Sequence, residues 1–181
     1  MDFGHVVLSR SKSSWISKQI AFFTGSYFSH AFVTAPPMCD RLMCLEAVAG
    51  GVSAIPFDIA YENCPDESFI EYDVLVSAEI KEKALSVIMN NLEIGYGFLE
   101  YPWLIWRWLC KKLGKDIKSH NNWSNDGIIC SELVVEYLTE CGLGKLFEGF
   151  GVAAVTPEDL YQIVLANPQY FKEIKRKDCT V

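Results

Sequence analysis

The sequence of 181 residues lacks several features that would assign it to a familiar class. It contains no Cys-x-x-Cys pair, and its three histidines, His5, His30 and His120, are scattered, so we expect no metal site and no cofactor. No apolar run reaches about 18 residues, which excludes a membrane-spanning helix. The net charge of -7 argues against general nucleic-acid binding, because contacts to phosphates need a basic face.

The first five residues also lack the charged start and apolar run of a signal peptide. The sequence therefore predicts a cytoplasmic protein whose thiols are reduced and mostly buried as small apolar groups. It has seven cysteines, an odd number, so complete pairing within one chain is impossible. They are Cys39, Cys44, Cys64, Cys110, Cys130, Cys141 and Cys179.

Short apolar segments in the first 76 residues predict antiparallel strands, and helices are expected before and after them. This arrangement is typical of an α+β fold rather than of alternating βαβ units. We expect one domain over 1–181, with an aromatic-rich insertion around 98–124 and a solvated basic tail after 171. The expected strands are 4–9, 29–35, 42–48, 52–55 and 69–76, with a turn at 36–40, and the expected helices are 13–23, 78–92, 128–141 and 156–165.

Cys130 differs from the other cysteines because it lies at the start of a predicted helix. Unpaired N–H groups and the positive end of the helix dipole favour a thiolate there, as a nucleophile requires. In the hairpin that joins 29–35 to 42–48, opposing Ala35 to Arg41 places His30 opposite Glu46. The carboxylate would then orient the imidazole and stabilise its charged form. The alternatives are a buried structural thiol, a His30 that is only a satisfied strand histidine, and a solvated Glu46. Spacing along the sequence does not by itself choose His30 over His5 or His120 as the base.

At this point the sequence resembles the permuted NlpC/P60 papain-like proteins, of the YiiX-like and lecithin:retinol acyltransferase-like type. The resemblance covers most of residues 4–165 in the same order. It departs from the family at His5, where an acidic residue is common, and at 97–100, where a tyrosine–aspartate pair is common. The matching segments are 4–10, 27–33, 45–48 with 51–52, 95–98, 130–134 and 156–160.

The resemblance implies a permuted papain-like fold, a small antiparallel sheet or half-barrel packed against helices, with a catalytic cysteine at a helix N-terminus. Cys130 would be the nucleophile, His30 the base and later the acid, and Glu46 the orienting group. Tyr27 and Tyr96 are expected to line the substrate site, with core packing as the alternative.

The resemblance implies a thiol hydrolase that cuts an amide bond, in a peptide, a peptidoglycan stem peptide or a protein isopeptide. An acyltransferase or a lipid or thioester hydrolase would use the same triad, and a catalytically silent binding module is the third alternative. Residues 98–109, rich in tryptophan around Arg107, are either a core helix or a peripheral contact with lipid. A cell-wall substrate would require virion-associated or lysis-assisted delivery, since no export signal is visible.

Overall fold

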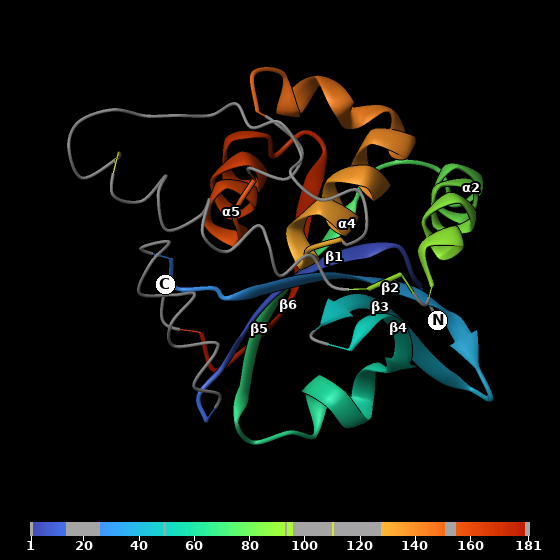
Figure 1. Ribbon diagram of the computed structural model, residues 1–181, viewed down its shortest axis with the longest axis vertical. Helices are drawn as coiled ribbons and strands as arrows, with labels where there is room; N and C mark the ends of the chain where they lie inside the picture. Colours follow the sequence, from blue (N-terminus) through green and yellow to red (C-terminus); the bar gives the residue numbers. More distant parts are fainter. Residues whose placement is uncertain are drawn as a thin grey trace.

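The structure, a computed structural model, describes residues 2–13, 26–48, 50–92, 94–95, 110, 128–150 and 155–179. Within these residues the chain forms a six-stranded antiparallel sheet with the order β4-β3-β2-β1-β5-β6 (Figure 1). The α+β class predicted from the sequence is therefore confirmed. The strands are β1 (His5–Ser11), β2 (His30–Met38), β3 (Arg41–Val48), β4 (Gly51–Pro56), β5 (Glu67–Val74) and β6 (Phe171–Lys177).

In the described part of the chain, three α-helices lie on one side of this sheet, and a short helix lies on the other (Figure 1). The three are α2 (Ala78–Ile88), α4 (Cys130–Leu138) and α5 (Pro157–Ala166), and the short helix is Asp58–Glu62. Shorter helical turns follow α2 and α4, at Met89–Asn91, Thr139–Leu143 and Gly144–Phe147. No helix in the described part of the chain has the length and apolar character needed to cross a membrane.

The strands alternate, so each face of the sheet contributes to its own apolar core. The larger core contains Val6, Leu8 and Val33 and packs against the three α-helices. The smaller core, on the side of the Asp58–Glu62 helix, is mostly aromatic. Its buried members are Val7, Phe32, Cys44, Phe57, Tyr61 and Phe69.

The helix starts follow the predicted capping residues. The Ser77 hydroxyl accepts the N–H of Ile80 at the start of α2, over 3.4 Å. At the start of α5 the Thr156 hydroxyl accepts the N–H of Asp159, and the Asp159 carboxylate accepts the N–H of Thr156 in return. Both caps are local in sequence, which is why the pattern predicts them well.

The predicted turn at 36–40 is too long. β2 continues through Pro36 and Pro37 to Met38, and the turn is only Cys39 and Asp40, with φ of 52° and 61°. Such a turn matches the twist of a two-residue hairpin. The prolines fit because the β2–β3 register shifts between Ala35 and Met38, and proline is tolerated at such irregularities.

The basic run near the C-terminus is not a tail. It forms β6, an edge strand paired with β5, in which most residues are exposed. The Lys177 ammonium donates to backbone carbonyls of Tyr61, Glu62 and Cys64. The predicted helix at 13–23 lies largely outside the described residues. The predicted insertion at 98–124 and its 98–109 segment also lie outside them, apart from a buried Cys110.

Candidate active site

Cys130 is the first residue of α4, and two side chains hold this end of the helix in place. Glu132 accepts the N–H of Ile129 over 3.4 Å, one turn back, as a carboxylate near a helix start does. The Ser131 hydroxyl donates to the carbonyl of Val155 over 2.6 Å, which ties α4 to the segment that leads into α5. Cys130 is only 5% exposed, so its sulfur lies inside the molecule rather than on its surface.

The sulfur of Cys130 meets the backbone of β2 where β2 and β3 separate. The last pair of β2 with β3 on the side of His30 is Val33 with Leu45. No further β2–β3 pair forms beyond it among the described residues. On β2, two residues before Val33, the N–H of Ala31 donates to the Cys130 sulfur. The N–H of Ser131 donates to the same sulfur. The separated strands therefore free a backbone donor for the thiolate.

His30, the first residue of β2, joins Cys130 to Glu46. Its ring Nε2 lies 3.0 Å from Oε2 of Glu46, and its imidazole also forms a side-chain hydrogen bond with Cys130. Because Nε2 is engaged by Glu46, Nδ1 is the ring nitrogen left to face the sulfur. The structure thus brings together the three side chains that the sequence predicts as a triad.

The predicted pairing that led to Glu46 is nevertheless wrong by two residues. Ala35 lies opposite Met43, not Arg41, so the same register places Glu46 level with Phe32 rather than with His30. A shift of two residues keeps each side chain on its original face of the sheet. Glu46 and His30 therefore still share a face, and they meet as diagonal neighbours.

Tyr61 is a further part of the site that sequence reasoning missed. It is buried in the short helix Asp58–Glu62, and its hydroxyl donates to Oε2 of Glu46, the oxygen that also contacts His30. Its ring stacks on Phe32 at 4.2 Å between centroids. Nothing in the sequence around residue 61 indicates this contact, because it depends on how the connection after β4 folds back beneath the sheet.

The site favours a charged thiolate–imidazolium pair. Burial by itself lowers the pKa of His30, but its hydrogen bonds and attraction to Cys130 and Glu46 outweigh burial and raise it to about 10. Burial raises the pKa of Cys130, but the hydrogen bond and charge of His30, with the N–H groups of Ala31 and Ser131, lower it overall. The Glu46 pKa is also lowered, because its bonds to His30 and Tyr61 outweigh burial.

In three other cysteines the thiol pKa is raised rather than lowered. Burial raises the pKa of Cys44, Cys141 and Cys179, and none of these three thiols hydrogen bonds to a histidine in the described part of the chain. Cys130 therefore stands apart from them in its electrostatics as well as in its position at a helix start.

Of the two tyrosines predicted to bind substrate, the structure describes only Tyr27. It is half-buried, its ring contacts Phe28 edge to face, and the guanidinium of Arg10 lies 5.1 Å from its centroid. Its hydroxyl donates to the carbonyl of Asp178 over 3.4 Å. A substrate role for Tyr27 stays a prediction, and Tyr96 lies outside the described residues.

No group of metal-ligating side chains in the described ranges includes Cys130 or His30. The group found there consists of Asp2, His5 and Asp73. It lies at the opposite end of β1, where His5 faces Asp73 on β5. Cys130 and His30 are residue types that serve as nucleophile and as acid or base.

No family model matches the chain, and no curated protein matches it. Among solved structures it is similar to the metalloprotein yiiX from Escherichia coli O157:H7, described as DUF1105. The two chains are 19% identical, the similarity covers 97% of each, and the TM-score is 0.64. At this identity the likeness concerns the fold. The chain therefore has a YiiX-like α+β fold over nearly its whole length.

Proposed function

We propose that this protein is a cysteine-dependent hydrolase that cleaves an amide bond through an acyl-enzyme. Cys130 is the nucleophile, His30 the general acid and base, and Glu46 the residue that orients and charges His30. The observation that carries the proposal is that one imidazole contacts both the Cys130 thiol and the Glu46 carboxylate. That arrangement is the one expected of an activated nucleophile with an oriented base.

The first half-reaction forms a thioester and releases an amine. The Cys130 thiolate attacks the carbonyl carbon, and the negative charge moves to the carbonyl oxygen. The backbone N–H of Cys130, at the first position of α4, has no acceptor within its own helix and would stabilise that oxyanion. As the tetrahedral intermediate collapses, the C–N bond breaks and the His30 imidazolium gives its proton to the departing nitrogen.

The second half-reaction returns the enzyme to its starting state. Neutral His30 takes a proton from water, and the resulting hydroxide attacks the thioester carbonyl. The C–S bond breaks, the acid product leaves, and Cys130 is again a thiolate beside imidazolium. Glu46 stays ionised throughout and stabilises His30 whenever it carries charge, which agrees with the lowered pKa of Glu46.

A substrate panel with mass spectrometry tests the proposal. The full chain is incubated with peptides, peptidoglycan fragments and isopeptide-linked substrates, and in parallel with acyl lipids and acyl thioesters. We expect amide cleavage, and a covalent acyl adduct on the peptide that contains Cys130. Cys130→Ala removes both, whereas Cys141→Ala, another buried thiol outside the site, retains both.

The outcomes separate the alternatives. Acyl transfer to an amine or alcohol, or release of acyl chains from lipid without amide cleavage, would replace the amide-bond assignment and keep the triad. No turnover and no Cys130 adduct with any class would contradict the enzyme assignment and favour a binding module.

A further inference from the structure

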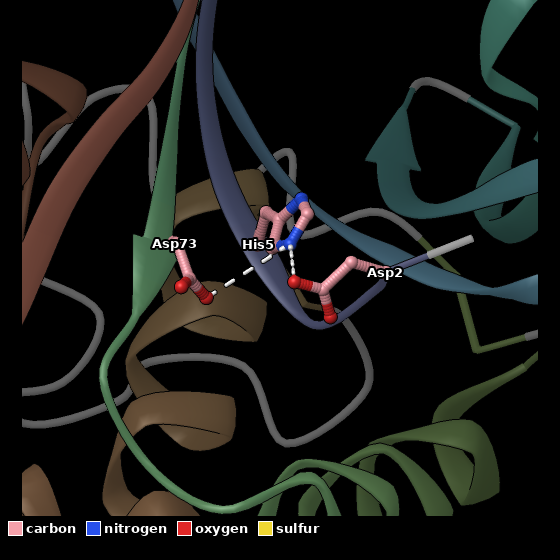
Figure 2. A group of neighbouring side chains, drawn as sticks. All are labelled: Asp2, His5 and Asp73. Carbon is pink, nitrogen blue, oxygen red and sulfur yellow. Dashed lines mark ion pairs between the residues drawn. The ribbon is translucent and has the colours of Figure 1, made fainter.

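A second buried polar cluster lies at the N-terminal end of β1. His5 is the first residue of the strand, and Nε2 of its ring faces the carboxylates of both Asp2 and Asp73 (Figure 2). Its Nε2 is 3.5 Å from Oδ2 of Asp2 and 3.9 Å from Oδ1 of Asp73. The chain thus gathers one imidazole and two carboxylates from residues 2, 5 and 73.

The orientation of the His5 ring is fixed by a hydrogen bond at Nδ1, the ring nitrogen that faces away from Asp2 and Asp73. Its Nδ1 lies 2.7 Å from Oε1 of Glu71, and both side chains are about 95% buried. A carboxylate on one ring nitrogen is the arrangement that directs the other nitrogen of a histidine toward a metal. Here that other nitrogen, Nε2, is buried and has no hydrogen-bond partner in the described structure. A buried polar atom without a partner is costly, so its position between two carboxylates calls for an explanation.

We propose that Asp2, His5 and Asp73 bind a divalent transition-metal ion, with Zn²⁺ as the ion of choice. Ligand atoms about 2.0–2.1 Å from a tetrahedral zinc lie roughly 3.4 Å from one another. The distances from His5 Nε2 to the two carboxylates are close to this value, and the three ligand atoms all lie within 4.8 Å of one another. An imidazole with two carboxylates is a donor set that zinc accepts, with a fourth position left for water.

The charge of the cluster supports a divalent cation. Asp2, Glu71 and Asp73 carry three negative charges, and the Lys81 ammonium, 2.5 Å from Oδ1 of Asp73, supplies one positive charge. With His5 neutral, as a metal ligand must be, two of these negative charges remain without a counter-ion among the described residues. Lys81 competes for the same Asp73 oxygen, so it weakens the site rather than forming part of it. The other interpretation of the cluster is a protonated His5 held by the three carboxylates, with no metal.

The proposed metal site is separate from the Cys130 site. His30 lies opposite Ser9 on β1, four residues along the strand from His5, which is about 13 Å at the usual rise of a β-strand. A metal at His5 is therefore too far away to contact the Cys130 sulfur. Its direct effect would be to hold the segment before β1 against β5, through Asp2 and Asp73.

Titration with Co²⁺ and Zn²⁺ tests this proposal. The full chain, free of any affinity tag and treated with a chelator, is titrated with Co²⁺ while its absorption spectrum is recorded, and then with Zn²⁺ by calorimetry. We expect one equivalent of Co²⁺ with visible bands of a tetrahedral ion and no thiolate charge-transfer band, and displacement by Zn²⁺. That spectrum excludes binding to Cys130 or another thiol.

Matched substitutions locate the site. Asp2 is 72% exposed in its side chain, so Asp2→Asn does not disturb the core, and we expect it to weaken binding about tenfold or more. Asp73→Asn and His5→Gln are expected to abolish binding of the one equivalent of Co²⁺. Asp66→Asn makes the same chemical change at an exposed carboxylate outside the cluster and should leave binding unchanged.

The variant Lys81→Met distinguishes a metal site from a buried network of ion pairs without a metal. Removing the competing ammonium should tighten Co²⁺ binding about tenfold, since Asp73 is then free to bind the ion. Circular dichroism checks that this variant is folded. Should it not be, the weaker binding expected of Asp2→Asn, at an exposed side chain, decides instead. Absence of saturable binding by the wild-type chain, a thiolate band, or binding that Asp2→Asn and Asp73→Asn leave unchanged would each overturn the proposal.

Discussion

Nε2 of His30 lies 3.0 Å from Oε2 of Glu46, although the two residues are not opposite each other in the β2–β3 hairpin. The register would bring Phe32 level with Glu46, and the hydrogen bond crosses diagonally. This contact becomes possible where the two strands separate, at the point where the Ala31 N–H turns to the Cys130 sulfur. Strand separation thus provides both the donor to the thiolate and the space for the imidazole.

The alkylation rate of Cys130 should depend on pH in a way that no ordinary thiol shows. Because the pKa of Cys130 is lowered and that of His30 is raised to about 10, the ion pair exists between these two values. Labelling by iodoacetamide should therefore rise at a lower pH than for an ordinary thiol, and be mapped to Cys130 by peptide mass spectrometry. At neutral pH it should exceed labelling of the exposed Cys39 about tenfold.

His30→Ala is the control for that profile. It removes the charge that offsets burial, so the Cys130 pKa should rise and labelling at neutral pH should fall about tenfold for each pKa unit gained. A profile that His30→Ala leaves unchanged would show that the imidazole does not activate this thiol.

Glu46→Gln should raise the pH at which Cys130 becomes reactive toward iodoacetamide. The amide keeps an oxygen that accepts from His30 but loses the negative charge that helps to raise the His30 pKa. The imidazolium should then lose its proton at a lower pH and stabilise the thiolate less, so the Cys130 pKa should rise and the rate of alkylation at neutral pH should fall about tenfold. The pH profile of the variant measures this, and a profile unchanged from that of the wild-type chain would mean that Glu46 does not act through His30.

Tyr61→Phe should destabilise the protein by about 1–3 kcal/mol, the usual range for a hydrogen bond to a buried charged group. The ring that stacks on Phe32 is kept, so the loss isolates the hydroxyl that donates to Glu46. Urea unfolding followed by circular dichroism gives the free energy. Tyr170→Phe, at a partly exposed surface ring, is the matched control and should change it by less than about 0.5 kcal/mol.

Thr156→Ala should cost about 1 kcal/mol of stability, because α5 loses the hydroxyl that accepts the N–H of Asp159 over 3.1 Å. Thr156→Ser keeps that oxygen and should retain most of the stability. Chemical denaturation of both variants checks the expectation, and equal losses in the two would assign the effect to the methyl group instead.

The sequence by itself determined the elements that depend on local pattern. It predicted the class, five of the strands and the starts of α2 and α5, because periodicity and capping act over a few residues. It also predicted that His30 and Glu46 share a face, and this survived a wrong register because side-chain alternation has a period of two residues.

Only the tertiary structure decided what depends on contacts between distant segments. The basic run at 172–177 has no alternating pattern of its own, and it becomes β6 because the edge of β5 offers it a hydrogen-bonding partner. Tyr61 reaches Glu46, and residues 2, 5 and 73 gather around His5, through chain folding that no local spacing encodes. The physical reason is the same in each case. Burial and electrostatic attraction between segments that are distant in the sequence select these neighbours, and the local pattern of adjacent residues does not encode them.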